Sequence, residues 1–207
     1  MSYISSLTTE QVAALTTDNV VSLSTSQIQE LSSAQIVALT TDQAGVLTTA
    51  QVAALTTSQI DAFETEDLAA LTTSAVAALT TAQIQSLTTD QVAGLSSNQA
   101  GALTTVQLRV LTTEQLVALE TADFAALSTA AVAALTTTQT QALTTDQLGT
   151  LSSDEIVALT TAQVAALTTA QIVGLTTAQT GGLTSVQVRA LTTAQVKALE
   201  TADFAAL

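Results

Sequence analysis

The side chains that could carry chemistry in this sequence are carboxylates and hydroxyls. The 207 residues include no His and no Cys, so the commonest general base, the thiol nucleophile and the main zinc ligands are all missing. The 17 acidic residues are spread along the chain without a pairing that marks an acid and a base. We therefore predict that the chain is not an enzyme and has no catalytic residue, no cofactor-binding residue and no metal ligand.

The densest acidic cluster is formed by Glu64, Glu66 and Asp67. Carboxylates are the ligands that Ca²⁺ prefers, but this cluster lacks the Gly turn and the alternating spacing of a calcium-binding loop. We expect no calcium site there.

Pairs of Thr recur evenly along the whole chain. A flat, regular Thr array is typical of several ice-binding proteins, so a ligand-binding or ice-binding surface is the alternative function. Two observations weigh against it, because Ser replaces Thr at many of these sites and acidic residues interrupt the array. Both hydroxyls of each pair are also expected to form hydrogen bonds within the fold.

The charge of the chain narrows its range of partners. A net charge of -14 repels a phosphate backbone and an anionic lipid surface, so we expect no nucleic-acid partner. Polar residues interrupt every apolar run well before the ~20 residues of a membrane span, so we expect no membrane insertion. Residues 1–6 have no basic segment or apolar core, and so predict no signal peptide. The basic residues are Arg109, Arg189 and Lys197.

The chain is an unbroken series of eight-residue units, or octads, with the consensus L-T-T-x-Q-V-x-A. From Leu7 to Leu207 every eighth residue is Leu, except Phe63. Position two is Thr or Ser except at Glu64, Glu120 and Glu200, position three is always Thr or Ser, and position five is usually Gln. We therefore divide the chain into a lead-in, residues 1–6, and a single repeat domain, residues 7–207, with 25 octads and a terminal Leu.

Two familiar architectures fit this period poorly. In one continuous helix the leucines would advance by ~80° per octad and spiral around the axis, so a coiled coil is disfavoured. A β-solenoid is a weaker alternative, because apolar positions one and six have opposite parity and turn residues hold no fixed place.

Short helices explain the octad best. Thr at position two and Gln at position five have the spacing of a capping box, while Leu at position one and Val at position six form the hydrophobic staple. Acidic residues such as Glu10 and Glu114 then lie in the first turn, where they favour the helix dipole. We predict that the hydroxyl at position three bonds to the carbonyl four residues earlier. Helices this short need stacking to be stable, so the predicted fold is an all-α repeat solenoid with one capped helix per octad.

A longer period is superimposed on the octads. Ala44-Gly45, Ala100-Gly101 and Thr180-Gly181 each precede an octad with Glu at position two and Asp at position five by three octads. A small residue at a fixed distance from a large one is expected in neighbouring layers of a packed core. We therefore predict about three octads per superhelical turn, with Phe63, Phe124 and Phe204 filling the space beside each glycine. Recent duplication would preserve the same spacing without any contact, and stays an open alternative.

Runs such as Leu159-Thr160-Thr161-Ala162-Gln163-Val164-Ala165-Ala166 resemble the octapeptide repeat tracts of very large secreted or surface proteins of proteobacteria. The resemblance covers nearly the whole chain and implies an adhesin-like stalk, but it carries over no ligand residue. The expected function is a non-enzymatic scaffold, namely a rigid acidic spacer or a self-assembling surface element, with an extracellular or cell-surface location favoured.

The two ends of the repeat domain carry no polar capping octad. The last octad is as apolar as the interior ones, and Tyr3 and Ile4 provide only a partial cover for the first. We therefore expect one of two partners: flanking repeats or domains of a larger protein, or a second copy of the chain joined end to end.

Overall fold

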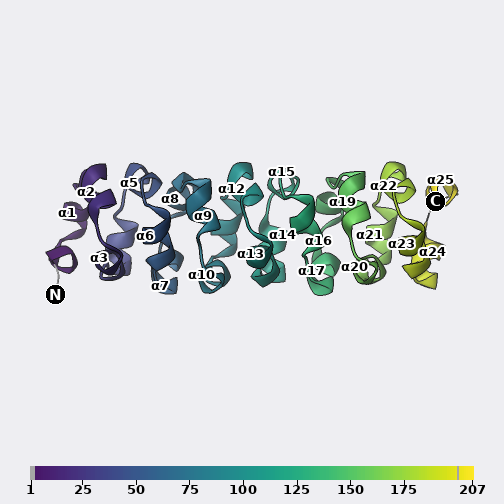
Figure 1. Cartoon of the computed structure of the whole chain (residues 1–207), viewed down its shortest axis with the longest axis horizontal. Coiled ribbons are helices and arrows are strands. Elements are labelled where there is room, and N and C mark those ends of the chain that lie inside the picture. The colour runs from purple at the N-terminus through teal and green to yellow at the C-terminus, as the bar shows by residue number, and fades with distance from the viewer. Residues whose placement is uncertain (1–2, 200) are drawn as a thin grey trace.

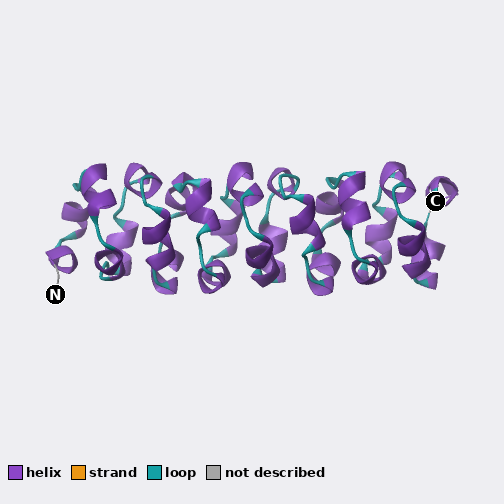
Figure 2. Ribbon diagram, viewed as in Figure 1, coloured by secondary structure: helices purple, strands orange, loops and turns teal. Residues whose placement is uncertain are grey.

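The computed structural model describes residues 3–199 and 201–207 as one row of short helices (Figure 1). The elements are η1 (Tyr3–Ser6), α1 (Thr9–Ala13), α2 (Thr17–Ser22), α3 (Thr25–Gln29), α4 (Ser33–Val37), α5 (Thr41–Gly45), α6 (Thr49–Ala54), α7 (Thr57–Asp61), α8 (Thr65–Ala70), α9 (Thr73–Ala77), α10 (Thr81–Ser86), α11 (Thr89–Ala93), α12 (Ser97–Gly101), α13 (Thr105–Val110), α14 (Thr113–Ala118), α15 (Thr121–Phe124), α16 (Thr129–Ala133), α17 (Thr137–Ala142), α18 (Thr145–Gly149), α19 (Ser153–Ala158), α20 (Thr161–Ala166), α21 (Thr169–Val173), α22 (Thr177–Gly181), α23 (Ser185–Ala190), α24 (Thr193–Ala198) and α25 (Thr201–Ala206). Each octad thus forms one α-helix, and all regular structure in the described residues is helical (Figure 2).

Each helix begins where the capping box predicts. In α6 the Thr48 hydroxyl accepts a hydrogen bond from the Gln51 backbone N–H at 3.2 Å, and the Thr48 N–H donates to Gln51 Oε1 at 2.9 Å. The same reciprocal box caps every helix from α1 to α24 except α8, α9, α15 and α16. Two of the backbone N–H groups left without a partner at a helix N-terminus are satisfied in this way.

Each helix ends at the next leucine or one residue before it, as α6 does at Leu55 and α5 at Val46. Leu55 is extended, with φ -55° and ψ 142°, and Thr56 follows with φ -74° and ψ 160°. Two consecutive residues outside the helical region turn the chain and start α7. Leu55 therefore lies between the end of α6 and the start of α7.

The helices wind into an elongated superhelix with the two termini at opposite ends (Figure 1). Each helix packs against the third helix along the chain, as α5 does on α8 and α11 on α14. The prediction of about three octads per turn is therefore confirmed. Helices seven octads apart, such as α3, α10 and α17, lie along the same side of the rod in Figure 1. A turn of about three and a half octads accounts for this alignment.

A single apolar core runs through the axis of this superhelix. It is made by the leucines of position one and the residues of position six, and interior residues such as Val52, Ile84 and Leu108 have no exposed surface. Positions two, three and four face outward. The core is continuous along the chain, so each octad is stabilised by its neighbours on the adjacent turns.

Candidate functional surface

The glutamine at position five ties successive turns together. Besides capping its own helix through Oε1, Gln51 donates from Nε2 to the carbonyls of Val20 and Leu23, both at 2.8 Å. These acceptors lie 31 and 28 residues earlier and belong to the C-terminal end of α2. One side chain thus satisfies the start of its own helix and the end of a helix on the preceding turn.

This inter-turn staple recurs with the same spacing along the rod. The side chains that donate to both carbonyls are Gln35, Gln43, Gln51, Gln59, Gln83, Gln91, Gln99, Gln107, Gln115, Gln139, Gln147, Gln163, Gln171, Gln179, Gln187 and Gln195. All of them are buried, and no buried side-chain nitrogen or oxygen in the described residues lacks a hydrogen-bond partner.

The capping box did not predict this second role of glutamine. A capping box accepts Glu as readily as Gln, yet Glu155 is the only Glu at position five. That bias shows in the sequence, and it has a physical reason: a carboxylate keeps the cap but has no N–H to donate to the preceding turn.

The prediction for the position-three hydroxyl was wrong. In the part of the chain that the structure describes, no such hydroxyl donates to the carbonyl four residues earlier. Some of these hydroxyls instead form hydrogen bonds with another turn. Ser153 Oγ, for example, donates to the Ala178 carbonyl on the next turn at 3.3 Å. The helix-end carbonyls of positions six and one are instead satisfied by the glutamine amides, and most position-three hydroxyls face solvent.

The staple is replaced at the octads with Glu at position two and Asp at position five. Glu64 and Glu120 make no side-chain cap, and the buried Asp accepts a hydroxyl hydrogen bond from the preceding turn instead. Ser97 Oγ donates to Asp123 Oδ1 at 2.6 Å, and Thr180 Oγ1 donates to Asp203 Oδ1 at 3.3 Å. Glu200 of the third such octad lies outside the described residues.

Burial raises the pKa of Asp67 above its ordinary value. A hydrogen bond from the Thr41 hydroxyl opposes this effect, and the nearby charges of Glu64 and Glu66 reinforce it. The exposed first-turn acids behave in the opposite way. Hydrogen bonds from backbone N–H groups, followed by those from the cap hydroxyls Thr8 and Thr112, lower the pKa values of Glu10 and Glu114. These acids therefore act as helix caps, as predicted.

The paired segments of the longer period are in contact, but the contact differs from the prediction. Helices α5, α12 and α22 pack on α8, α15 and α25 respectively. The atoms nearest a Cβ built on Gly45 or Gly101 belong to Ala70 and Ala126, and the Ala126 carbonyl oxygen would lie only 2.8 Å from it. The glycines therefore make room for a neighbouring backbone rather than for a Phe ring. Phe63 and Phe124 are buried in the core, whereas Phe204 is 59% exposed.

Comparison with protein families matches the ALTTAQ repeat over residues 23–57, 60–97, 116–153 and 151–185. These segments cover more than half of the chain. The chain belongs to the ALTTAQ repeat family. The comparison with curated proteins found no match.

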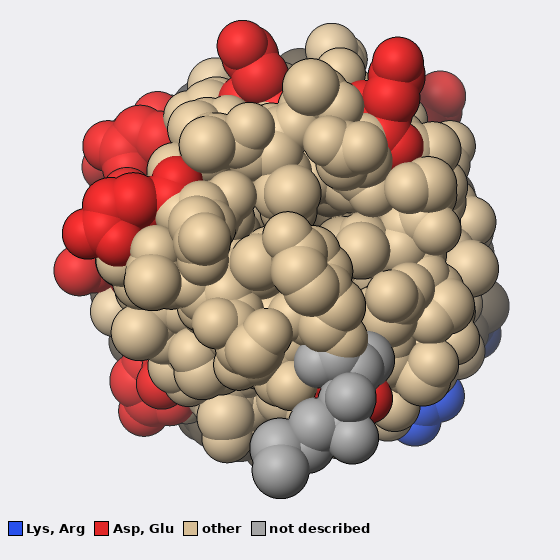
Figure 3. Space-filling view, turned by 90° about the vertical axis from the view of Figure 1, so that its left-hand side faces the viewer, with Lys and Arg blue, Asp and Glu red and all other residues tan. Residues whose placement is uncertain are grey.

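Charge is distributed unevenly over the ALTTAQ superhelix. Helices α5, α8, α12, α15, α19, α22 and α25 lie along one side, the top of Figure 1, and nine described acidic residues belong to their octads. These are Asp42, Glu64, Glu66, Asp67, Glu120, Asp123, Asp154, Glu155 and Asp203. Viewed along the axis, acidic side chains gather at the top and left, and basic side chains appear at the lower right (Figure 3).

The threonine pairs of the ALTTAQ octads do not line up between adjacent turns. The staple to the position-one carbonyl joins residues 28 apart, which is three and a half octads, as between Gln43 and Leu15. Equivalent Thr pairs on adjacent turns are therefore offset by about half an octad. This stagger is unfavourable for matching a flat lattice.

The described part of the molecule has no pocket. It contains no group of three or more acidic, His or Cys side chains placed to hold a metal ion, and this includes the cluster around Glu66. None of its helices has the length and apolarity needed to cross a membrane.

Proposed function

We propose that the chain is a rigid, acidic, non-enzymatic spacer that holds whatever it joins at a fixed distance. The observation that carries this proposal is the inter-turn staple, because it crosslinks each turn to the next along a continuous core. The short repeated helices and the repeat family fit a structural scaffold.

The chemistry of the side chains supports a role without catalysis. The sequence has neither His nor Cys, the first-turn acids cap helices, and Asp67, Asp123 and Asp203 accept hydroxyl hydrogen bonds within the fold. The acidic side favours solubility and lateral repulsion between rods. The resemblance to octapeptide tracts of secreted or surface proteins supports a stalk at a cell surface.

The spacer proposal is tested by shortening the rod in register. Deleting residues 45–100 removes seven octads, or about two turns, and joins Ala44 to Gly101 with the staple spacing and the glycine pair preserved. We expect small-angle scattering to show a rod of unchanged cross-section, shortened in proportion to the deleted octads. A deletion of residues 97–100, half an octad, is the control and should cost much more stability per residue. An unfolded seven-octad deletion, or one whose length does not scale, would overturn the proposal.

The alternative, an ice-binding or ligand-binding threonine surface, is weakened by the stagger of the Thr pairs between turns. Thermal hysteresis of the purified chain tests it directly. We expect a freezing point equal to that of a solution of matched osmolality, and a hysteresis gap would favour the alternative over the spacer.

A further inference from the structure

The lateral surface of the rod divides into an acidic side and a side with few charges. Helices seven octads apart lie on the same side of the rod, so each such set forms a column along it. Three adjacent columns carry all three basic residues of the chain but only two acidic residues, Asp18 and Glu30. We call these columns the low-charge face. Its helices are α2, α9, α16 and α23 in one column, α6, α13 and α20 in the middle column, and α3, α10, α17 and α24 in the third.

The other four columns carry all the remaining described acidic residues and no basic residue. The same division appears along the axis in Figure 3, where acidic side chains lie at the top and left and basic ones at the lower right. Two rods that met through their acidic sides would repel one another, whereas the low-charge face allows close approach.

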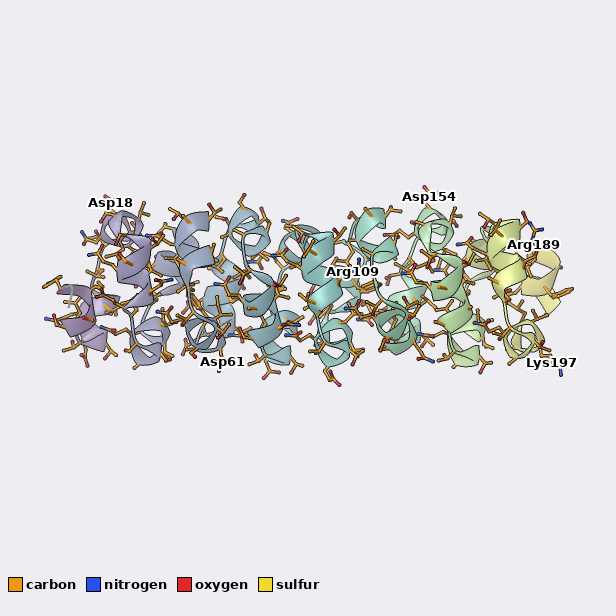
Figure 4. All side chains as sticks on the ribbon, turned by 60° about the horizontal axis from the view of Figure 1, so that its bottom comes forward. Asp18, Asp61, Arg109, Asp154, Arg189 and Lys197 are labelled. Carbon is orange, nitrogen blue, oxygen red and sulfur yellow. The ribbon has the colours of Figure 1, made fainter. Side chains whose placement is uncertain are left out.

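Within the low-charge face, each acidic residue shares a column with a basic one. Asp18 of α2 and Arg189 of α23 belong to one column, 21 octads or about six turns apart. Glu30, which follows α3, and Lys197 of α24 belong to another column at the same separation. All four side chains are exposed. Figure 4 shows Asp18 at one end of the rod and Arg189 and Lys197 toward the other.

This arrangement of charge is complementary to itself when a second copy is turned end for end. A two-fold axis perpendicular to both rods places each column against the same column of the partner and reverses its direction. Asp18 then faces the partner's Arg189. In the same way, Glu30 faces the partner's Lys197. In parallel rods Asp18 would instead face the partner's Glu30, and like charges repel. The charges therefore favour antiparallel pairing.

Both charge pairs fit a single register of the two rods. The midpoint of α2 and α23 and the midpoint of α3 and α24 differ by one octad, which is about 3 Å of rod if helices on adjacent turns pack at the usual ~8–10 Å. Helix α13 lies between these midpoints, in the middle column. Arg109 of α13 is therefore close to the two-fold axis, opposite the partner's Arg109, and is the one charge of the face that opposes the contact.

Exposed valines accompany these charges. Val106 of α13 and Val186 of α23 are 60% and 58% exposed, more than any other valine, and both lie on the low-charge face. Val106 has several turns on either side, so exposure of this degree belongs to the lateral surface of the rod. In the antiparallel arrangement Val106 lies near the axis, and Val186 lies near the partner's Val21, which is 44% exposed. The contact thus buries apolar surface beside the charge pairs.

We propose that two copies of the chain pair side by side and antiparallel through the low-charge face, with Asp18 against the partner's Arg189 and Glu30 against the partner's Lys197. The acidic columns then face outward and repel further rods, so association stops at a closed dimer. This inference goes beyond the spacer role and does not depend on it.

Sedimentation velocity of the full chain across a concentration series, with two charge-reversed variants, tests the proposal. We expect the wild-type mass to rise with concentration and to level at that of a dimer. The acidic variant is Arg189→Glu with Lys197→Glu, and the basic variant is Asp18→Lys with Glu30→Lys. Each places like charges opposite one another in its own dimer and should bind itself at least about tenfold more weakly. An equal mixture of the two restores every opposite-charge pair and should form a heterodimer, which also shows that both variants fold.

The control for the basic variant is Asp90→Lys with Asp146→Lys. It makes the same change in net charge at exposed first-turn positions of α11 and α18, on the acidic side, and should dimerise like the wild type. Arg109→Gln removes the repulsion near the axis and should tighten the dimer.

Three results would overturn the proposal. The first is a monomer at every concentration. The second is a basic variant that associates as strongly as the wild type or more strongly, because added cations would then strengthen binding of this face to an acidic surface. The third is a mixture of the two variants that does not associate. None of these results bears on how rod length scales in the in-register deletion, so the dimer and the spacer role can fail separately.

Discussion

At the scale of single residues, the fold depends on the two different ends of an amide group. The oxygen of each position-five glutamine caps its own helix, and the nitrogen satisfies carbonyls of the preceding turn. A buried carbonyl that loses its donor costs free energy, so the amide matters beyond its role in the cap. A substitution that keeps the oxygen of the side chain but removes its N–H donor therefore separates the role in the cap from the role in the inter-turn staple.

Gln91→Glu removes one staple and keeps the cap. The carbonyls of Ile60 and Phe63, now 2.9 Å and 2.8 Å from Gln91 Nε2, would face a carboxylate. We expect a loss of roughly 1–3 kcal/mol in the free energy of unfolding. The reciprocal change, Glu155→Gln, supplies a donor where the spacing places the carbonyls of Phe124 and Leu127, and should stabilise the chain. Urea unfolding measures both, and equal effects of the same sign would contradict the staple.

Asp67→Asn tests the buried carboxylate. Its raised pKa means that the folded state prefers the neutral acid, so its stabilising contribution is complete below the ordinary pKa and is lost as the pH rises through the folded value. Asn keeps an acceptor for Thr41 without the charge. The variant should therefore melt at a higher temperature than the wild type at neutral pH, and the difference should shrink on acidification. A difference that grows at low pH would refute this account.

Glu114→Gln provides the contrast of opposite sign. Hydrogen bonds to the carboxylate lower its pKa, so its stabilisation is present above the ordinary pKa and is lost as the pH falls through the folded value. The variant should melt slightly lower than the wild type at neutral pH and converge with it in acid. Thermal melts at several pH values, run beside those of Asp67→Asn, measure both trends.

At the scale of elements, helices of four to six residues persist only because they are capped and packed. The existence and start of each helix could be predicted from the octad, because Thr at position two and Gln at position five form a local motif. The hydrogen-bond partner of the position-three hydroxyl could not be predicted in this way. Its neighbours come from another turn, as Ser97 and Asp123 show, and that pairing depends on the winding of the superhelix rather than on local spacing.

The glycine contacts between turns separate packing from helix propensity. Gly101 and Gly149 each end a helix, but a Cβ at Gly101 would lie 2.8 Å from the Ala126 carbonyl oxygen, whereas a Cβ at Gly149 would meet nothing within 4 Å. Gly149→Ala should stabilise the chain by up to about 1 kcal/mol through reduced backbone entropy. Gly101→Ala should destabilise it. Circular dichroism melts compare the two, and equal shifts would contradict the close contact between α12 and α15.

At the scale of the whole molecule, the chain is a one-dimensional assembly with a single continuous core. The solenoid and the count of about three octads per turn could be predicted, since a core needs large and small residues at matching distances. The half octad by which each turn exceeds three could not be predicted from the paired segments alone. It shows in the hydrogen bonds of the glutamine side chains, which join residues 28 and 31 apart on different turns.

Truncating one interior leucine tests the continuity of the core. Leu103 is 5% exposed, so Leu103→Ala should leave a cavity shared by neighbouring turns and cost roughly 2–5 kcal/mol. Val106→Ala, at a position that is 60% exposed, is the matched control and should change stability by less than about 0.5 kcal/mol. Chemical denaturation followed by circular dichroism gives both values. Similar small losses at the two sites would show that position one does not form the core.

Hydrogen exchange of the glutamine side-chain amides, followed by nuclear magnetic resonance, tests the inter-turn staple most directly. At concentrations where the chain is monomeric, we predict strong protection of Nε2 in interior residues such as Gln51 and Gln91, whose amides donate to the preceding turn. Gln11 and Gln27 share the capping box, but their Nε2 groups donate to no described residue, so they should exchange as fast as the exposed Gln85. Equally fast exchange from the interior and first-turn glutamines would contradict the account.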